Sequence, residues 1–335
     1  MSTDISSIFT HGNLIDVNVG IWTAERQLQS EDLGLKDTDV SEAFNLGSKK
    51  LVPPEKVAEF RHLDYKIRNT LQRYSFAFAF GQARFVPKTV FADFVAEADA
   101  VIKEFDNLAD AFEKAYPQYK LDMRKFYVEA ANSAYDRARQ LCGFSQDRDE
   151  FINAFLERVD KFYPPVEKIR QKFHMEYVVF QVALPDLTRA SYEDIAEENE
   201  KVNLLQEAYR KSIYRKVHEF VDKIVSEQRT RVNEVTKHVA EALKTGRKIS
   251  ESTLNMVRKM IEEFRKMNVV EDRILDDKLL EFRTKYLDGV TAKKVRENAA
   301  LQEEMLKELN ALADLAGNQE AITAIADDYR SKINL

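Results

Sequence analysis

Residues 191–246 read SYEDIAEENEKVNLLQEAYRKSIYRKVHEFVDKIVSEQRTRVNEVTKHVAEALKTG, and this stretch decides the fold. Apolar side chains recur every three or four positions along it, which places them on one face of an α-helix. Ser191 and Asp194 stand at the spacing of a capping box, and Gly246 follows the last periodic residue. A helix is therefore predicted from Ser191 to Thr245. Its apolar stripe consists of Val202, Leu205, Tyr209, Ile213, Val217, Phe220, Ile224, Val232, Val235, Val239 and Ala242.

A helix of this length requires other helices to cover its stripe. About 50 residues span roughly 75 Å at the usual rise per residue, and such a helix is not stable alone in water. The predicted cover is the helical region 88–142, folded back antiparallel. The expected fold class is therefore mainly α: an elongated bundle of long antiparallel amphipathic helices.

The same spacing predicts the other helices. One starts at Pro53-Pro54, where proline is tolerated in a first turn. Another starts at Lys88 and is expected to end at Pro117. The remaining predicted helices cover residues 121–141, 147–162, 165–175, 252–267, 269–287 and 291–316, with a short last helix that ends near residue 333.

Three short segments change to the period of a β-strand. Residues 14–22 alternate apolar and polar side chains, residues 75–86 form a Phe-rich candidate hairpin with Gly81 at the reversal, and residues 177–184 (YVVFQVAL) form a third candidate strand that Pro185 ends. These segments are expected to form a small antiparallel β element at one end of the helices. Residues 23–52 are expected to be an extended connection with at most one short helix.

The 335 residues divide by pattern into three regions. Residues 1–52 form an N-terminal strand and connection, residues 53–246 a long-helix bundle with a β tip, and residues 247–335 a C-terminal helical region packed on the bundle. One continuous domain is the alternative, because long bundles often reach this length as a single body.

Composition excludes several classes of protein. Hydrophobic residues make up 44% and charged residues 32%, as amphipathic helices require. The net charge of −6 argues against a general nucleic-acid or anionic-membrane surface. The single Cys142 excludes an intramolecular disulfide and a cysteine metal cluster. No apolar run reaches membrane-spanning length and the N-terminus lacks signal-peptide features, so a cytoplasmic location is expected. The single cysteine fits a reducing cytosol or the interior of an infected cell.

Motifs that carry chemistry are missing from the sequence. It contains neither a phosphate-binding glycine loop nor an H-E-x-x-H pair nor a G-x-S-x-G elbow, and its five histidines are scattered. Its adjacent carboxylates are typical of solvated helix faces, because the Glu-x-x-His motif, which di-iron bundles need on two helices, occurs only once, at Glu59–His62. We therefore expect a protein that is not an enzyme, with no catalytic, cofactor-binding or metal-binding residues.

The candidate interaction surface combines the hairpin with one exposed part of the long helix. Aromatic side chains dominate the hairpin, and basic residues interleaved with tyrosine mark the helix. The candidate residues are Phe76, Phe78, Phe80, Phe85, Arg210, Lys211, Tyr214 and Arg215.

Two other functions remain open for this surface. A membrane-active, pore-forming-like helical protein with an apolar β hairpin is one, although about five residues per strand is half of what a transmembrane strand needs. A nucleic-acid-binding protein is the other, although the basic and acidic residues of 192–245 nearly balance. Membrane and nucleic acid are thus less favoured partners than protein.

Three landmarks together resemble a known family. They are the Val17-Asn-Val-Gly-Ile-Trp22 segment leading to Arg26 and Leu28, the Gly81-x-x-x-Phe85-Val-Pro87 turn, and the Ser252-Thr-Leu-Asn-Met-Val-Arg258 helix leading to Asn268 and Asp272. The combination resembles a helical family of unknown function from bacteria and phages, with members encoded near MoxR-type AAA ATPases and von Willebrand factor A proteins. The resemblance implies a binding role beside an ATPase, or a phage accessory role, and assigns no site residues.

The function expected from the sequence is a non-catalytic helical scaffold or adaptor that acts through protein–protein interaction. Its expected partner is a second copy of the chain in an oligomer or coiled coil, or an AAA ATPase or von Willebrand factor A protein.

Overall fold

A computed structural model describes residues 11–28, 47–78, 82–142, 146–181, 196–245 and 249–332, without the side chains of 141, 142, 196–206, 209, 210 and 213. The chain forms two compact units. The first comprises residues 1–16, 71–95 and 179–335, and the second comprises residues 17–70 and 96–178.

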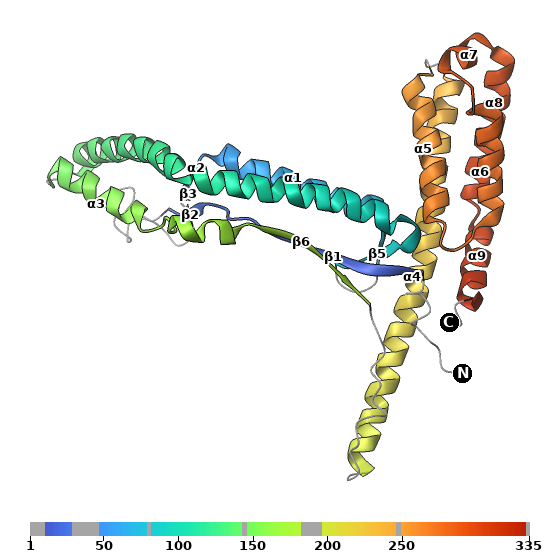
Figure 1. Ribbon diagram of the computed structural model, residues 1–335, viewed down its shortest axis with the longest axis horizontal. Helices are drawn as coiled ribbons and strands as arrows, with labels where there is room; N and C mark the ends of the chain where they lie inside the picture. The colour runs from blue at the N-terminus through green and yellow to red at the C-terminus, as the bar shows by residue number, and fades with distance from the viewer. Residues whose placement is uncertain are drawn as a thin grey trace. The chain divides into compact units, whose positions relative to one another are not determined.

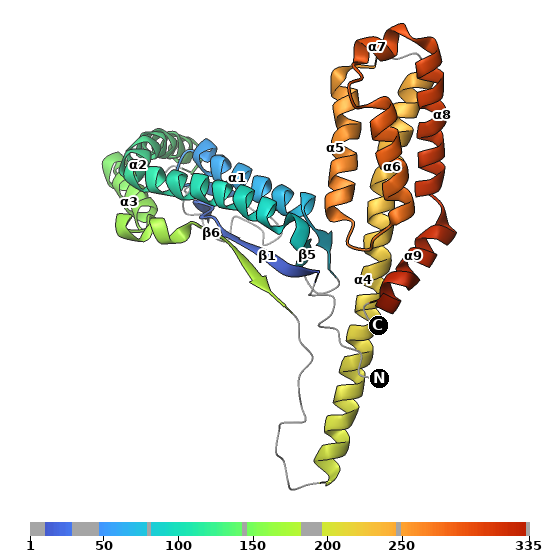
Figure 2. The ribbon, with the colours of Figure 1, turned by 45° about the vertical axis from the view of Figure 1, so that its right-hand side comes forward.

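The first unit is built around α4 (Ala196–Lys244), a helix of 49 residues. Figure 1 and Figure 2 show α5, α6 and α8 alongside the C-terminal half of α4. The predicted long helix is thus confirmed over its described length, whereas its predicted cap at Ser191 and Asp194 lies outside the described residues. The other helices of this unit are α5 (Glu251–Met267), α6 (Arg273–Tyr286), α7 (Ala292–Glu297), α8 (Ala299–Ala316) and α9 (Gln319–Lys332).

The C-terminal half of α4 forms one wall of an apolar core. Val232 and Val239 are 1% and 0% exposed and pack in one cluster with Leu254 of α5, Leu275 of α6 and Leu309 of α8. The helices that cover α4 are α5, α8 and α9. The prediction that residues 88–142 cover the stripe is therefore wrong. The short connections after α4 bring the next amphipathic helices back onto it, which is the simplest way to bury its stripe.

The sequence also predicted one helix over 291–316, and the structure divides it at Asn298. This residue ends α7 and begins α8, where its side chain accepts a hydrogen bond from the Leu301 amide at 3.0 Å. Asn is a favoured N-cap because its side chain replaces a missing helical acceptor. The apolar spacing continues across the break, so periodicity alone did not show it.

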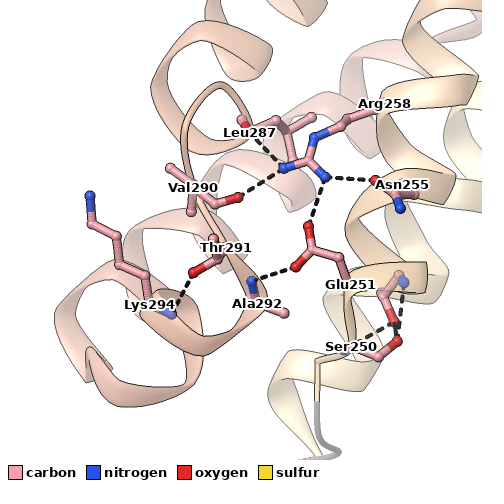
Figure 3. Close-up of polar contacts among 10 residues, drawn as sticks. Ser250, Glu251, Asn255, Arg258, Leu287, Val290, Thr291, Ala292 and Lys294 are labelled. Carbon is pink, nitrogen blue, oxygen red and sulfur yellow. Dashed lines mark hydrogen bonds and ion pairs between the residues drawn. The ribbon is translucent and has the colours of Figure 1, made fainter.

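A polar network fastens the loop between α6 and α7 to the start of α5 (Figure 3). The Arg258 guanidinium donates to the main-chain oxygens of Leu287 and Val290, both at 2.8 Å. Glu251 accepts from the Ala292 amide at 2.9 Å and from Arg258 at 3.1 Å. These two bonds, the amide one first, hold the pKa of the Glu251 carboxyl below its ordinary value. The network therefore satisfies loop main-chain groups that have no helical partner.

Helix α9 contacts α4 beside His218. The Arg330 guanidinium donates to the His218 main-chain oxygen at 3.4 Å and to the Asp222 carboxylate, and also binds Asp327 at 2.6 Å. The Tyr214 ring lies 4.1 Å from the His218 ring, centre to centre. Desolvation by burial, followed by the Arg330 charge, lowers the pKa of His218 below 6.5. Native His218 therefore takes up a proton less readily than the unfolded chain does.

We expect the docking of α9 on α4 to weaken as the pH falls through about 6.5 toward the lower native pKa, because the unfolded state then binds more protons. The protection factors of α9 amides against hydrogen exchange, which correct for the slower intrinsic exchange at lower pH, should fall over that interval in the wild type. A His218→Gln variant should lack this fall, whereas His238→Gln, at an exposed position of the same helix, should retain it. An equal fall in His218→Gln would contradict the assignment.

The second unit is organised by an aromatic core. The Phe60 side chain of α1 (Pro54–Arg73) is fully buried. Its ring centre lies 4.2 Å from that of Phe173, 5.2 Å from Phe105 and 5.6 Å from Phe112, the last two in α2 (Lys88–Cys142). Trp22 lies edge-on to Phe112 at 6.5 Å. Figure 1 and Figure 2 show α1 running alongside α2.

Helix α2 is longer than the sequence predicted. It runs for 55 residues with Pro117 inside it, so the prediction that Pro117 ends a helix and that another begins at Leu121 is wrong. Proline removes one helical hydrogen bond and kinks a helix, but tertiary packing can hold the helix together. Here the buried Phe112 and Tyr116 precede Pro117, and Tyr127 and Ala131 follow it. Burial on both sides of the proline maintains one helix.

The rest of the second unit follows α2. Helix α3 (Arg148–Asp160) confirms the helix predicted at 147–162, and two 3-10 helices, η4 (Val166–Lys168) and η5 (Arg170–Lys172), replace the α-helix predicted at 165–175. Phe173 is extended and buried, and it carries the chain into β6 (His174–Phe180). Because Phe173 is already extended, with φ −122° and ψ 119°, the helical geometry stops at Lys172.

The predicted small antiparallel sheet is confirmed, as is the mainly helical class. It joins β1 (Gly12–Gly20), β4 (Phe76–Ala77), β5 (Arg84–Pro87) and β6 in the order β4-β5-β1-β6. The predicted hairpin pairs Phe76 with Phe85, and β5 in turn pairs Phe85 with Leu14. At Gly12 an added Cβ would lie 2.4 Å from the Phe85 ring, so only glycine fits there.

The sequence did not predict a second, two-stranded sheet. Strand β2 (Glu25–Gln27) pairs antiparallel with β3 (Ser48–Lys50), and an ion pair joins Glu25 to Lys50. Both strands are short and charged, so they show no apolar alternation. Residues 29–46 between them lie outside the described part of the chain.

Among the described helices, none combines the length and the apolar character that crossing a membrane requires.

Candidate functional site

A cleft of about 360 Å³ lies in the first unit, between the hairpin and helices α4 and α5. The end of α1 and strands β4 and β5 form one side, through Ser75, Phe76 and Arg84. Residues 226–234 of α4 and 260–267 of α5 supply the other side. The volume is within the range of small-ligand pockets, at its lower end.

Apolar side chains form the floor of this cleft. They are Phe76 at 4% exposure, Val232 at 1%, Met260 at 3%, Phe264 at 5% and Met267 at 4%. Methionine side chains are flexible and polarisable, and they adapt to irregular apolar surfaces. The floor can therefore accommodate an apolar group of a ligand without one fixed shape.

Arg84 projects from the hairpin into the cleft and keeps hydrogen-bonding capacity there. Its Nε donates to Ser75 Oγ at 2.6 Å and its Nη2 donates to the Ser75 main-chain oxygen at 3.2 Å. Within the described residues Nη1 has no acceptor, and no carboxylate lies within ion-pair distance. Desolvation by burial lowers the pKa of the guanidinium, which nevertheless stays charged. A half-buried, incompletely bonded guanidinium is suited to bind an acceptor.

Gln228 of α4 supplies a hydrogen-bond acceptor, which complements the donor of Arg84. The residue is 6% exposed, and its Nε2 donates to the main-chain oxygen of Met267 at the end of α5. Its Oε1 is buried and has no hydrogen-bond partner in the part of the chain that the structure describes. A buried acceptor without a donor is energetically costly, so a donor from a ligand or a water molecule is expected there.

A buried ion pair beside Gln228 fixes this turn of α4. Arg229 Nε lies 2.7 Å from Asp272 Oδ2, and the two side chains are 1% and 2% exposed. The same guanidinium donates to the Leu315 main-chain oxygen of α8 at 2.7 Å, and Asp272 also caps α6 by accepting from the Leu275 amide at 3.2 Å. Three helices therefore position the residues that line the cleft.

The rim of the cleft carries mixed charge, from Glu227, Glu234 and Glu263 and from Arg84 and Arg231. Glu263 lies 4.0 Å from Arg231 and 3.8 Å from Lys259, and Glu227 lies 3.7 Å from Lys223. Glu234 has no ion-pair partner among the described side chains, so it is the rim group that favours a positive charge on a ligand.

The aromatic residues of the sequence-predicted surface are mostly core residues. Phe76 is on the cleft floor, while Phe78 and Phe85, 6% and 0% exposed, pack against Phe220 of α4 at 4.5 and 5.3 Å between ring centres. Phe80 lies outside the described residues. Phe78 and Phe85 therefore hold the hairpin on α4, because their rings are buried against that helix.

The basic residues predicted on α4 lie apart from the cleft. Lys211 pairs with Glu207 at 3.0 Å, and Arg215 lies 3.8 Å from Glu219. Tyr214 is 39% exposed. Arg210 is within α4, but its side chain is outside the description. Paired charges spaced four residues apart are typical of a solvated helix face.

Sequence reasoning included Phe76 but missed the other cleft residues, although one signal was present. The apolar stripe of α4 continues from Ile224 to Val232, and the position between them holds Gln228. A polar residue at a core position indicates a buried hydrogen-bonding group. Arg84 gave a weaker signal, as the charged residue between Ala83 and Phe85 in an otherwise apolar strand.

The arrangement is suited to recognition by hydrogen bonds and apolar contact. The cleft offers one donor group, one buried acceptor, a soft floor and a charged rim. Groups of three or more His, Cys, Asp or Glu side chains able to hold a metal ion do not occur among the described residues.

Comparison with known proteins gives one match. The model of DUF3150, described as a protein of unknown function, matches residues 12–314. No curated protein and no solved structure matches the chain. The match includes Arg84, Gln228 and Asp272, so the cleft and the ion pair behind it lie within the matched region. The resemblance to a helical family of unknown function is thereby confirmed, and the chain belongs to the DUF3150 family.

Proposed function

We propose that this protein is a non-catalytic helical scaffold or adaptor that acts by binding other proteins. The observation that carries the proposal is the cleft beside the hairpin. Its floor is apolar, its rim is charged, and Arg84 and Gln228 keep unused hydrogen-bonding capacity inside it. An apolar centre with a polar rim is the usual anatomy of a protein-binding surface.

Partners encoded beside the gene are the first to test. The resemblance stated above suggests an AAA ATPase of the MoxR type or a von Willebrand factor A protein, or a phage accessory role. A helical protein with a fixed cleft would act on such an ATPase by presenting or recruiting a segment of another chain. In the other form of the proposal, the chain binds further copies of itself. The native mass distinguishes such an oligomer from a monomer.

The test starts from the native mass of the purified protein, measured by light scattering, and continues with affinity capture from the host. Captured proteins are identified, purified and mixed with this chain at physiological salt. We expect a stable oligomer or a complex that co-elutes with defined stoichiometry. A monomer that forms no complex with any purified candidate would overturn the proposal.

The two other functions predict different results in the same series. Leakage of dye from liposomes would favour a membrane-active protein, and it would require release of the buried Phe76 and Phe85 from the fold. Binding to DNA or RNA that weakens steeply with salt would favour a nucleic-acid partner. Either result without a protein complex would replace the scaffold proposal.

A further inference from the structure

The cleft has unused hydrogen-bonding groups of both kinds, and this limits what can fill it. Arg84 Nη1 is free to donate to an acceptor, and the buried Gln228 Oε1 lacks a donor among the described residues. A peptide group supplies both, through its carbonyl oxygen and its N–H. A lone anion would satisfy Arg84 alone, would leave Gln228 Oε1 without a donor, and would meet the unpaired charge of Glu234.

The floor and the rim add two further requirements. The buried Met260, Phe264 and Met267 favour an apolar side chain on the ligand. Glu234, which has no ion-pair partner among the described residues, favours a positive charge close to that side chain. The volume of about 360 Å³ limits the buried part to a small number of side chains.

We infer that the cleft binds a short peptide segment of a partner protein, with an apolar side chain on the floor and a lysine or arginine next to it. Arg84 donates to a main-chain carbonyl of that segment, and Gln228 Oε1 accepts from a main-chain N–H. The cationic side chain lies toward Glu234 at the rim. This inference rests on the proposed function and specifies the chemistry of the partner.

The anchoring of both groups makes this recognition rigid. Ser75, itself 4% exposed, accepts from Arg84 Nε and donates to the Leu71 main-chain oxygen, so the guanidinium is held from behind. Gln228 is held by the Met267 main-chain oxygen, and its neighbour Arg229 by Asp272. Groups that are held in place before binding lose little conformational entropy when the ligand arrives.

The probe is an array of capped six-residue peptides with a central leucine, flanked in turn by lysine, glutamine or glutamate. The tightest peptide is then measured in solution by calorimetry with the full-length protein. We expect the lysine-flanked peptides to bind about tenfold more tightly than the glutamate-flanked ones, as one charge-assisted contact implies. Methylation of a single main-chain nitrogen at the contacting position should weaken the best peptide by a similar factor.

Protein variants test the assigned groups. Arg84→Met should weaken the best peptide about tenfold, and Glu234→Lys should remove the preference for lysine over glutamate. Glu241→Lys is the matched control, because it makes the same charge change at an exposed position of α4 outside the cleft. If Arg84→Met fails to fold, the methylated peptide and Glu234→Lys still decide the question.

Three results would overturn the inference: no peptide of the array binds in solution, binding is indifferent to main-chain methylation, or the glutamate-flanked peptides bind best. The scaffold proposal is tested separately by mixing Glu234→Lys with the full-length partner. A partner that binds this variant and the wild type equally would leave the scaffold proposal standing and remove the cleft from it.

Discussion

Replacement of Asp272 by Asn should lower the free energy of unfolding by about 3–5 kcal/mol, the usual effect of removing one partner of a buried ion pair. Asn remains a good N-cap, so the capping bond to the Leu275 amide is retained. The change in stability therefore reports the loss of the Asp272 charge alone. Arg229, 1% exposed, would keep an uncompensated charge in the core. Urea denaturation followed by far-ultraviolet circular dichroism measures the change.

Two further variants show whether burial is the cause. Asp276→Asn removes the partially exposed pair with Arg265, 3.0 Å apart, and should change stability by about 1 kcal/mol or less. The double variant Arg229→Met with Asp272→Asn removes both charges and should recover part of the loss, because no unpaired charge then remains. The explanation would be contradicted if the loss of stability in the double variant equalled the summed losses of Arg229→Met and Asp272→Asn measured separately.

Replacement of Phe60 by Ala should also lower the free energy of unfolding by about 3–5 kcal/mol, as expected for a large cavity in a core. The fully buried Phe60 ring stacks on Phe173 and contacts Phe105 and Phe112, so its removal leaves three rings without their common neighbour. Trp22, the single tryptophan, lies edge-on to Phe112 in the same unit. Its fluorescence therefore follows the unfolding of this core, and its urea midpoint should fall.

Tyr65→Ala is the matched control on the same helix. The Tyr65 side chain is 66% exposed, and its loss should change stability by no more than about 0.5 kcal/mol. Equal effects of the two substitutions would show that the aromatic core does not hold this unit together.

The helices and the small sheet were predictable because their sequence patterns are determined locally. The stripe of α4 shows the helical period with one interruption, at Gln228, and the hairpin sequence shows its strand period on both sides of a glycine. The partners of α4 were not predictable in the same way. An apolar stripe shows that other helices must cover it, but several amphipathic segments of this chain could do so. Which helices pack on α4 therefore depends on tertiary packing.

The errors at single residues have physical causes too. Pro117 is a helix breaker by local propensity, yet buried side chains before and after it keep α2 continuous. Asn298 is an ordinary polar residue by composition, yet its side chain caps α8 and divides the predicted helix. In both cases tertiary contacts or capping outweigh the periodic pattern.

The cleft could be anticipated only in part. Gln228 interrupts the stripe, which indicates a buried polar group on α4, but the sequence does not show that Arg84 of the hairpin faces the same space. The sequence predicted the phenylalanines of the hairpin as part of an interaction surface and left open whether they are buried or exposed. Their described members are buried, because a short hairpin needs an apolar face packed on a helix to be stable.

Site-specific photo-crosslinking in living cells tests the central claim most directly. A benzophenone amino acid replaces Thr230, an exposed residue that lines the cleft, and in a second strain Lys237, an exposed residue of the same helix outside it. If a partner binds in the cleft, we expect a discrete crosslinked adduct from position 230 that Glu234→Lys abolishes. We expect no adduct of that mass from position 237. No adduct from position 230, or the same adduct from both positions, would contradict binding in the cleft.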